Sequence, residues 1–596
     1  MHRHTLKDRF YNNKTTIITM NKYILNMAAA AIALTSMTSC IQDFVPEQGV
    51  ASKDQVEQAP TAFNSLTNAL TSTLCGEYAY GGATELYAND FGYPATLLMH
   101  DIMGQDIAPV DASGYEWFSS WYIASGIAPS NANTQMSWSY YYGWIKNCNV
   151  LISMAGENPT TDQYAGLGQA YALRAMMYLD LVRMYANKTY AADKNAETVP
   201  MVTEATSYKN NDNPRMTNEK AFAFILSDLD KAEKYLANYQ RNDVYTPDLS
   251  VAYGLKARAY LTMEDWANAE NYAKLAMAGY NVMSAADYTS HTEGFSTPNG
   301  AWMFACKFQA TDNNVKLNDG DGSWGSKMVT ESASGCGYAA NYGFPLMIDA
   351  HLYNSMPATD CRKKCFIDPS VDEIEMPKKK DDKGNMVDDV DAYNALLVQA
   401  LTPYSDFPAV LAANKPCYGY VEVKFRNAGG AAGIQSQYTG FCMAVPLMRV
   451  EEMKLIEAEA VGMQAGREAE GINLLTAFAK TRDANYEYGH HNEAYGNTAT
   501  SAFQNEVWWQ RRVEFWGEGL AMFDIKRLNK GVIRSYEGTN HVEMYRWNTT
   551  SAPSWMNYCI PSSETAYNKS CTNNPSPTQT AGDSDPFDFG DKVGNK

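Results

Sequence analysis

Paired amphipathic helices, with small residues where the two helices meet, are the feature that most restricts how this chain of 596 residues can fold. Apolar residues recur at three- and four-residue steps over residues 251–261 and again over residues 266–278, with a short polar break between the two segments. Ala269, Ala273 and Ala276 allow two antiparallel helices to approach closely, and the tyrosines of both segments fill the space between neighbouring pairs. This alternation of small and large residues is typical of tetratricopeptide-like helical pairs.

The same helical period recurs elsewhere in the chain. The further segments are residues 163–185, residues 217–235, and a second pair formed by 446–465 and 468–482. Thr217 stands where its hydroxyl can cap the second of these helices. The sequence therefore predicts a mainly α fold with a tetratricopeptide-like scaffold of at least three helical pairs, over residues 140–280 and 446–535.

The stretch between the two scaffold parts has a different composition. Residues 281–445 are richer in Gly, Asn, Ser and Thr, and charged loops such as 378–383 indicate solvent exposure. We expect residues 61–596 to form a single domain in which this stretch is a large loop-rich insertion. Loops held by rigid helices are where recognition usually lies, so we expect binding to use residues 281–445 and the aromatic, glycine-rich stretch 76–143.

The N-terminal region resembles a secretory signal peptide. Met20, which we take as the true start, precedes a lysine, an apolar run over residues 23–34 and small residues that lead to Cys40. The run is too short for a transmembrane helix, and small residues before a cysteine are typical of bacterial lipoproteins. We expect residues 1–39 to be removed, Cys40 to be lipidated and residues 40–60 to form a tether. Ordinary secretion with an incidental Cys40 is the alternative.

The charge balance narrows the class of partner. The chain has 48 Lys and Arg against 67 Asp and Glu, a formal net charge of −19, whereas nucleic-acid binding needs clustered cations. An anionic bilayer should also repel the folded body. Charged residues make up only 19% of the chain, so neutral hydrogen bonding dominates its surface, which favours sugars as ligands.

The known catalytic and metal-binding motifs are absent from the sequence. No HExxH, GxSxG, P-loop or dinucleotide fingerprint occurs, and we expect no cofactor.

Cys361 and Cys365 lack partners at zinc spacing, which favours buried cysteines over a metal site. Residues 318–322 resemble part of a calcium loop without its later ligands, so calcium stays open. Glycosidases need only two converging carboxylates, so motif absence does not exclude that chemistry.

A specific resemblance lies near the C-terminus, where residues 511–528 read RRVEFWGEGLAMFDIKRL. This segment resembles the signature of the SusD/RagB family, which consists of lipid-anchored outer-membrane proteins of Bacteroidetes. Other segments that resemble the family are residues 142–152, 174–185, 449–460 and the Ile560-Pro561 region. The resemblance implies a tetratricopeptide-type frame, oligosaccharide binding at the cell surface, and docking on a SusC-like TonB-dependent transporter.

The charged residues of the signature are expected to be structural. They are Arg511, Glu514, Glu518, Asp524 and Arg527. We expect them to form ion pairs between packed helices, where the loss of one partner would leave a buried charge uncompensated.

Candidate ligand residues follow from the chemistry of sugars, whose apolar faces stack on aromatic rings. The first group is Tyr115, Trp117 and Trp121, and the two tryptophans would share one face of a helix. The second group is Trp324, Tyr338 and Tyr342 in the loop-rich module. Packing of Trp117 and Trp121 in the core is an equal alternative.

The sequence as a whole predicts a non-enzymatic, surface-exposed lipoprotein of the outer membrane. It would bind oligosaccharide or polysaccharide and deliver the ligand to a SusC-like transporter. A RagB-like subunit that binds oligopeptides is the first alternative, and an exported glycosidase is the second.

Overall fold

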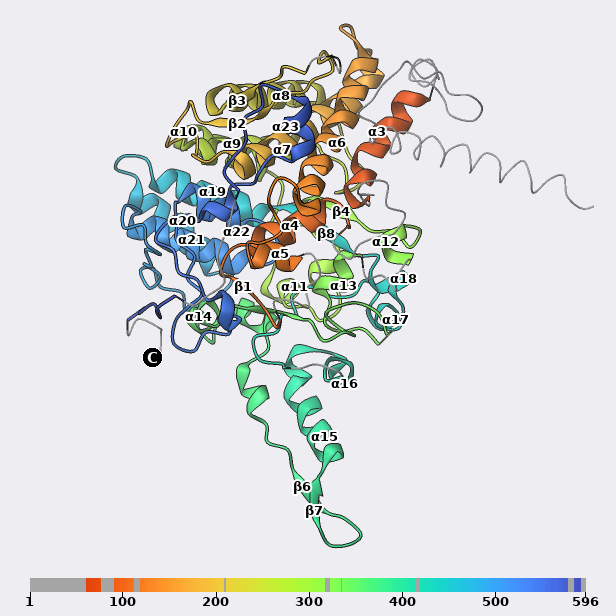
Figure 1. Ribbon diagram of the computed structural model, residues 1–596, viewed down its shortest axis with the longest axis vertical. Helices are drawn as coiled ribbons and strands as arrows, with labels where there is room; N and C mark the ends of the chain where they lie inside the picture. Colours follow the sequence, from red (N-terminus) through yellow and green to blue (C-terminus); the bar gives the residue numbers. More distant parts are fainter. Residues whose placement is uncertain are drawn as a thin grey trace, which may run out of the picture.

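The computed structural model describes residues 61–76, 90–111, 118–207, 209, 211–316, 322–333, 335–413, 417–576 and 584–590. The predicted signal peptide, Cys40 and the tether lie outside these residues. The fold is mainly helical, as predicted (Figure 1). No helix in the described part is both long enough and apolar enough to cross a membrane.

The first part of the scaffold is a series of antiparallel helices. They are α6 (Ala132–Ala155), α7 (Tyr164–Tyr185), α8 (Asn218–Leu236), α9 (Leu249–Met263) and α10 (Trp266–Ala276). Consecutive helices pack on one another. Thr217 caps α8 as predicted, since its hydroxyl accepts a hydrogen bond from the backbone N–H of Lys220 at 3.3 Å. Asp248 and Asp265 cap α9 and α10 in the same way, so the predicted pair is confirmed.

The second part of the scaffold comes from the C-terminal half of the chain. Its helices are α19 (Val450–Gly462), α20 (Glu468–Ala479), α21 (Ala502–Glu514) and α22 (Ala521–Arg527). Helix α19 packs on both α20 and α10, which joins the two parts. Glycine is needed where α19 meets α20, because a Cβ atom at Gly471 would lie 2.5 Å from the Cα atom of Gly462.

The prediction of one helix over residues 446–465 is wrong at its start. Residues Ala444–Arg449 form strand β8, which pairs antiparallel with β4 (Trp302–Lys307). All six residues of β8 are buried, so their apolar side chains are covered on both faces of the strand. A short continuous apolar run of this kind does not distinguish a buried strand from a helix, and the partner strand lies about 140 residues earlier.

Short elements dominate the loop-rich stretch and the remaining segments. The helices are α3 (Ala62–Ser72), α4 (Tyr93–Ile102), α5 (Phe118–Tyr122), α11 (Ala285–Tyr288), α12 (Asn313–Lys316), α13 (Trp324–Met328), α14 (Ala350–Ser355), α15 (Val390–Leu401), α16 (Pro408–Leu411), α17 (Gly430–Ile434), α18 (Gln437–Gly440) and α23 (Ser562–Tyr567). The strand pairs, all antiparallel, are β1 (Ile107–Pro109) with β5 (Leu346–Ile348), β2 (Glu197–Pro200) with β3 (Arg215–Thr217), β4 with β8, and β6 (Lys378–Lys380) with β7 (Met386–Asp388).

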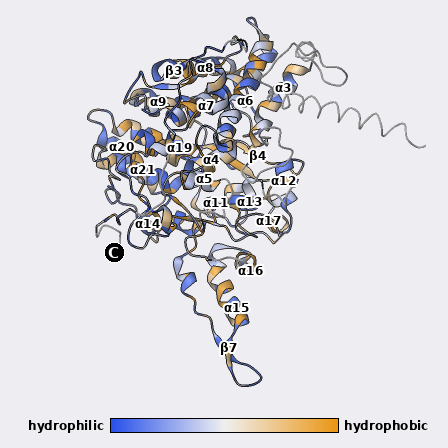
Figure 2. Cartoon of the chain, viewed as in Figure 1, coloured by the Kyte–Doolittle hydropathy of each residue, from blue (hydrophilic) through white to orange (hydrophobic). Residues whose placement is uncertain are grey.

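One segment of the loop-rich stretch projects from the body. Strands β6 and β7 form a hairpin at its tip, and α15 leads back towards the body (Figure 1). Apolar side chains remain exposed on this arm, including Met386, Val390 and Leu396. Hydrophobic positions of α15 are visible on the arm in Figure 2, whereas most hydrophobic residues of the scaffold helices are buried.

Candidate functional site

Two of the predicted stacking residues are buried in the core. The side chains of Trp121 and Trp324 are 1% and 0% exposed. The ring of Trp324 packs edge-on against Phe425, with the centroids 5.3 Å apart, and Trp121 packs against Phe118 at 6.0 Å. The prediction that these two indoles form an exposed platform is therefore wrong, because neither has a ring face open to a ligand.

The other members of the first group lie outside the described residues. Tyr115 and Trp117 precede Phe118, the first residue of α5, so their role as ligand contacts stays a prediction.

Tyr338 and Tyr342 form an aromatic pair at the surface of the loop-rich module. Their ring centroids are 5.3 Å apart and the ring planes are tilted by 51°. Tyr342 is 47% exposed, and Tyr338 is partly exposed. The structure therefore brings the two predicted tyrosines together and leaves part of their surface accessible, which is what stacking on a sugar ring requires.

The backbone around this pair is held by the preceding helix. The hydroxyl of Ser326 in α13 accepts a hydrogen bond from the N–H of Tyr338 at 3.0 Å, and the Ser326 carbonyl accepts one from the N–H of Ala339 at 2.9 Å. Gly337 has a φ of +88°, and a Cβ atom there would lie 3.1 Å from the Phe441 ring. Only glycine fits this turn without strain, so the turn fixes where the two rings stand.

A buried lysine contacts one ring of the tyrosine pair. The ammonium of Lys327 lies 3.2 Å from the ring centroid of Tyr338 and 5.9 Å from that of Phe118. Lys327 itself is buried, so this cation–π contact forms away from water, where such contacts are strongest. The lysine thus links the start of α5 to the tyrosine pair.

A further exposed tyrosine, which the sequence analysis missed, lies in the same module. Tyr438 in α18 is 53% exposed. The adjacent Gln437 accepts a hydrogen bond from the thiol of Cys336, two residues before Tyr338, at 2.6 Å. The sequence signal that could have indicated its exposure is its position within the polar, glycine-containing run 435–440. We refer to Tyr338, Tyr342 and Tyr438 as the tyrosine surface.

The signature residues of the C-terminal helices form buried ion pairs, as predicted. Arg511 donates to Asp524 at 2.6 Å, and Asp524 also accepts from Arg527 at 2.8 Å. Glu518 accepts from Arg449 at 2.8 Å. These groups hold α21, α22 and the start of α19 together, and they are engaged with one another rather than directed at a ligand.

Glu514 is the centre of this network. Its carboxylate accepts from Arg482 at 2.9 Å and from Arg449 at 3.2 Å, and Arg362 lies 3.4 Å away. Burial by itself would raise the pKa of Glu514, but the attraction of Arg482 and Arg449 outweighs it and leaves the pKa well below its usual value. The group is therefore ionised and structural at neutral pH.

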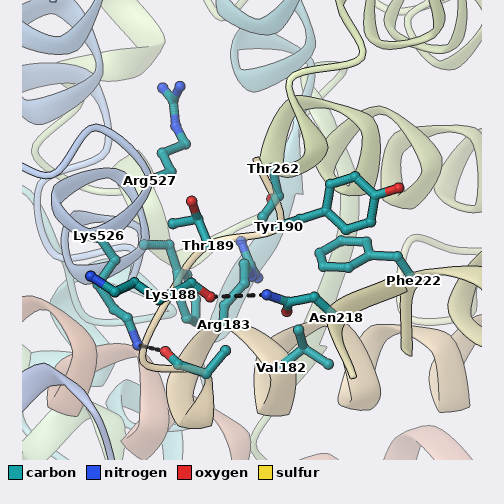
Figure 3. A pocket seen from close by; sticks show the side chains of 12 residues that line it. Val182, Arg183, Lys188, Thr189, Tyr190, Asn218, Phe222, Thr262, Lys526 and Arg527 are labelled. Carbon is teal, nitrogen blue, oxygen red and sulfur yellow. Dashed lines mark hydrogen bonds between the residues drawn. The ribbon is translucent and has the colours of Figure 1, made fainter. Parts of the chain in front are cut away.

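The scaffold contains a small pocket between α7, α8 and α22 (Figure 3). Lys526 lies beside it and donates to the backbone carbonyls of Met184 and Ala186, each at 3.1 Å. Burial lowers the pKa of this lysine to about 7. The pocket volume is about 30 Å³, which suits one or two water molecules and not a sugar ring.

The cysteines and acidic groups of the described residues do not assemble into a metal centre. No cluster of three or more His, Cys, Asp or Glu side chains there could hold an ion, and none of the cysteines there forms a disulfide. Cys361 and Cys365 begin and end a short 3₁₀ helix, and Cys365 is buried. Four of the five residues of the calcium-like loop, 318–321, lie outside the described part.

Two family models match the chain. One, described as "Starch-binding associating with outer membrane", matches residues 80–261, and the second, the SusD family model, matches residues 405–578. A curated relative, the SusD-like protein P38 of Formosa agariphila, is 28% identical over 149 residues. That match spans 24% of this chain and 27% of the relative's length.

Solved structures share the fold over nearly the whole chain. A SusD-like carbohydrate binding protein from Bacteroides vulgatus superposes with a TM-score of 0.62 at 20% identity, covering 85% of this chain and 96% of that one. A SusD superfamily protein from Bacteroides thetaiotaomicron gives 0.62 at 19%, covering 88% and 100%. Surface glycan-binding protein A from the same species gives 0.58 at 17%, covering 87% and 99%. These structures show the shared fold, and the two family models, over residues 80–261 and 405–578, show that the chain belongs to the SusD/RagB family.

Proposed function

We propose that this protein is a surface glycan-binding lipoprotein that captures oligosaccharides and delivers them to a SusC-like TonB-dependent transporter. The observation that carries the proposal is the tyrosine surface, where Tyr338 and Tyr342 stand together and partly exposed on a braced turn. Family membership supports binding of glycans at the outer membrane. Lipidation of Cys40 and the partnership with the transporter rest on the sequence and the family resemblance.

The proposed role is binding without catalysis. The charged residues of the signature are engaged in ion pairs within the protein. Neutral hydrogen-bonding groups and aromatic ring faces are therefore the groups that remain to contact the ligand. Two or three stacking contacts account for millimolar binding, which corresponds to about 4 kcal/mol. Weak binding suits a protein that passes its ligand to a transporter, and several copies on one surface would retain a long polymer.

The test is calorimetric titration of the chain carrying Cys40→Ser, which removes the lipid attachment point. The ligands are neutral linear oligosaccharides (maltoheptaose, cellohexaose, xylohexaose and mannohexaose) and, separately, a mixture of oligopeptides. We expect one oligosaccharide to bind and Tyr342→Ala to weaken that binding about tenfold, the equivalent of one stacking contact. Tyr342→Phe, which keeps the ring, should bind nearly as well as the unmodified chain.

Tyr567→Ala is the matched control, because Tyr567 is also 47% exposed but lies in α23, in the C-terminal segment outside the loop-rich stretch. Equal losses in Tyr342→Ala and Tyr567→Ala would contradict a specific site. Binding of peptides alone would favour the RagB-like alternative, and release of shorter sugars by the pure protein would favour the glycosidase.

A further inference from the structure

A large cleft lies away from the tyrosine surface. One wall is α14 with the turn that follows it, residues 351–363, and the other is the loop 483–493, while Trp509 of α21 lies at its base. Its volume is about 830 Å³, within the range of roughly 300–1,000 Å³ that is typical of small-molecule sites. The cleft is therefore large enough for a short oligosaccharide, unlike the scaffold pocket of Figure 3.

Several of the charged groups along the cleft have partners within the protein. Arg362 donates to Asp360 at 2.7 Å, and both side chains are buried. His351 and Glu493 are joined at 2.7 Å, and the ammonium of Lys363 donates to the carbonyl of Met356 at 2.8 Å. A charged ligand would have to displace these contacts, which favours a neutral ligand at these positions, and the exposed Glu487 lies elsewhere in the lining, 4.0 Å from His490.

Two stacked aromatic rings, those of His491 and Trp509, form the base of the cleft, and of the two only His491 is partly exposed, since Trp509 is 3% exposed. The rings of His491 and Trp509 are parallel within 1° and their centroids are 3.5 Å apart. The indole N–H of Trp509 donates to the hydroxyl of Ser355 at 2.8 Å, which fixes the stack against α14. Burial lowers the pKa of His491 to about 3, so its ring is neutral at physiological pH.

The rim of the cleft carries small neutral hydrogen-bonding groups. Asn354, Thr359 and Asn485 are exposed on the two walls, next to the exposed carbon surface of Pro357 and Ala358. Amide and hydroxyl groups both donate and accept, which is what the hydroxyls of a sugar need at its edges. A partly exposed ring, that of His491, beside neutral polar groups is a combination that can recognise a pyranose.

We propose that this cleft is a second carbohydrate subsite, which takes a short neutral segment of the same glycan or of another chain of it. The inference rests on the proposed function and extends it. Figure 1 shows α14 and α21 on one side of the body, with α13 and α18, which hold the tyrosine surface, on the other. Two separated subsites on one protein let a long glycan bind at both, because the second contact forms at a high effective concentration.

Hydrogen–deuterium exchange with the four oligosaccharides named above locates each subsite in the chain carrying Cys40→Ser. We expect the oligosaccharide that binds to slow exchange in residues 354–363 and 483–491 as well as in residues 337–344. Protection of 337–344 alone overturns the second subsite and leaves the proposed function standing. Protection of the cleft alone supports the subsite and removes the tyrosine surface as the site. No protection in either region with any of the four overturns both.

A substitution that fills part of the cleft provides an independent test of the second subsite. Ala358→Trp places a large side chain at the rim of the cleft, and Ala237→Trp, at an exposed alanine beyond the end of α8, is the matched control. We expect Ala358→Trp to lower the calorimetric stoichiometry from two to one, and Ala237→Trp to leave it at two. An unchanged stoichiometry and affinity in Ala358→Trp overturns the proposal, and an unchanged thermal melt of that variant shows that folding is intact.

Discussion

Two fully buried glutamates, one in the scaffold and one in the loop-rich stretch, differ in how completely their negative charge is compensated. Glu514 in α21 meets Arg482, Arg449 and Arg362, and its pKa lies well below the usual value. Glu422, in the loop-rich stretch, accepts hydrogen bonds from the backbone N–H groups of Lys424 and Phe425. Burial raises the pKa of Glu422 to about 8, since those bonds and the nearby cations offset it only in part.

The comparison teaches which residues the fold constrains. In the scaffold, Glu514 is compensated by three arginines from other segments of the chain, and the loss of one partner would leave a buried charge uncompensated. In the loop-rich stretch, the charge of Glu422 is compensated only in part, and aromatic and apolar side chains such as Tyr342 and Met386 stay exposed. Stability is concentrated in the first region, and the surface that a ligand or partner could use is concentrated in the second.

The largest expected effect is in the scaffold network. Glu514→Ala leaves three arginines without their common carboxylate, and we expect a loss of about 3–5 kcal/mol in the free energy of unfolding. Guanidinium denaturation followed by circular dichroism measures it. Glu470→Ala, at an exposed pair with Arg467, is the control and should lose far less. Similar losses in both variants would mean that the buried network around Glu514 contributes no more stability than an exposed ion pair.

The second effect is a pH dependence in the loop-rich stretch. The pKa of Glu422 is raised from 4.5 to about 8 on folding, so the folded state holds the proton more tightly and stability falls as the pH rises through that window. We expect a fall of about 2–3 kcal/mol between pH 6 and pH 8 from this group. Glu422→Gln, which carries no titratable carboxyl, should lack that part of the fall. Parallel stability profiles for the two proteins over this range would contradict the assignment.

The smallest effect is expected on the projecting arm. Met386 is 61% exposed at the hairpin tip, so Met386→Ser should change the free energy of unfolding by no more than about 0.5 kcal/mol. Met453→Ala in α19 is the buried counterpart and should cost about 2–5 kcal/mol. A large loss in Met386→Ser would mean that the arm packs against the body, and the comparison would then need to be redrawn.

The helical pairs were predictable because their signal is local. Apolar spacing and the cap at Thr217 act within a few residues, and α7, α8, α9 and α10 begin and end close to the predicted positions. The start of the helix predicted over 446–465 was not predictable, because its first residues pair with a strand far away in the sequence.

Two single residues of the candidate site show the same difference between what local sequence predicts and what distant segments decide. Trp324 and Tyr342 both belong to the same glycine-rich region and carry similar aromatic signals. Trp324 is covered because Phe425 and Phe91, from distant segments, pack against its ring. Tyr342 is 47% exposed, and Tyr338 is the aromatic ring found packed against it.

The amino-acid sequence by itself determined the helical scaffold, the family to which the chain belongs and the structural role of the charged signature, since these depend on spacing within short segments. The tertiary structure alone decided which aromatic rings face solvent and where the 830 Å³ cleft opens between residues 351–363 and 483–493. The physical reason is that exposure depends on what the rest of the chain packs against a residue, and that packing joins segments hundreds of residues apart.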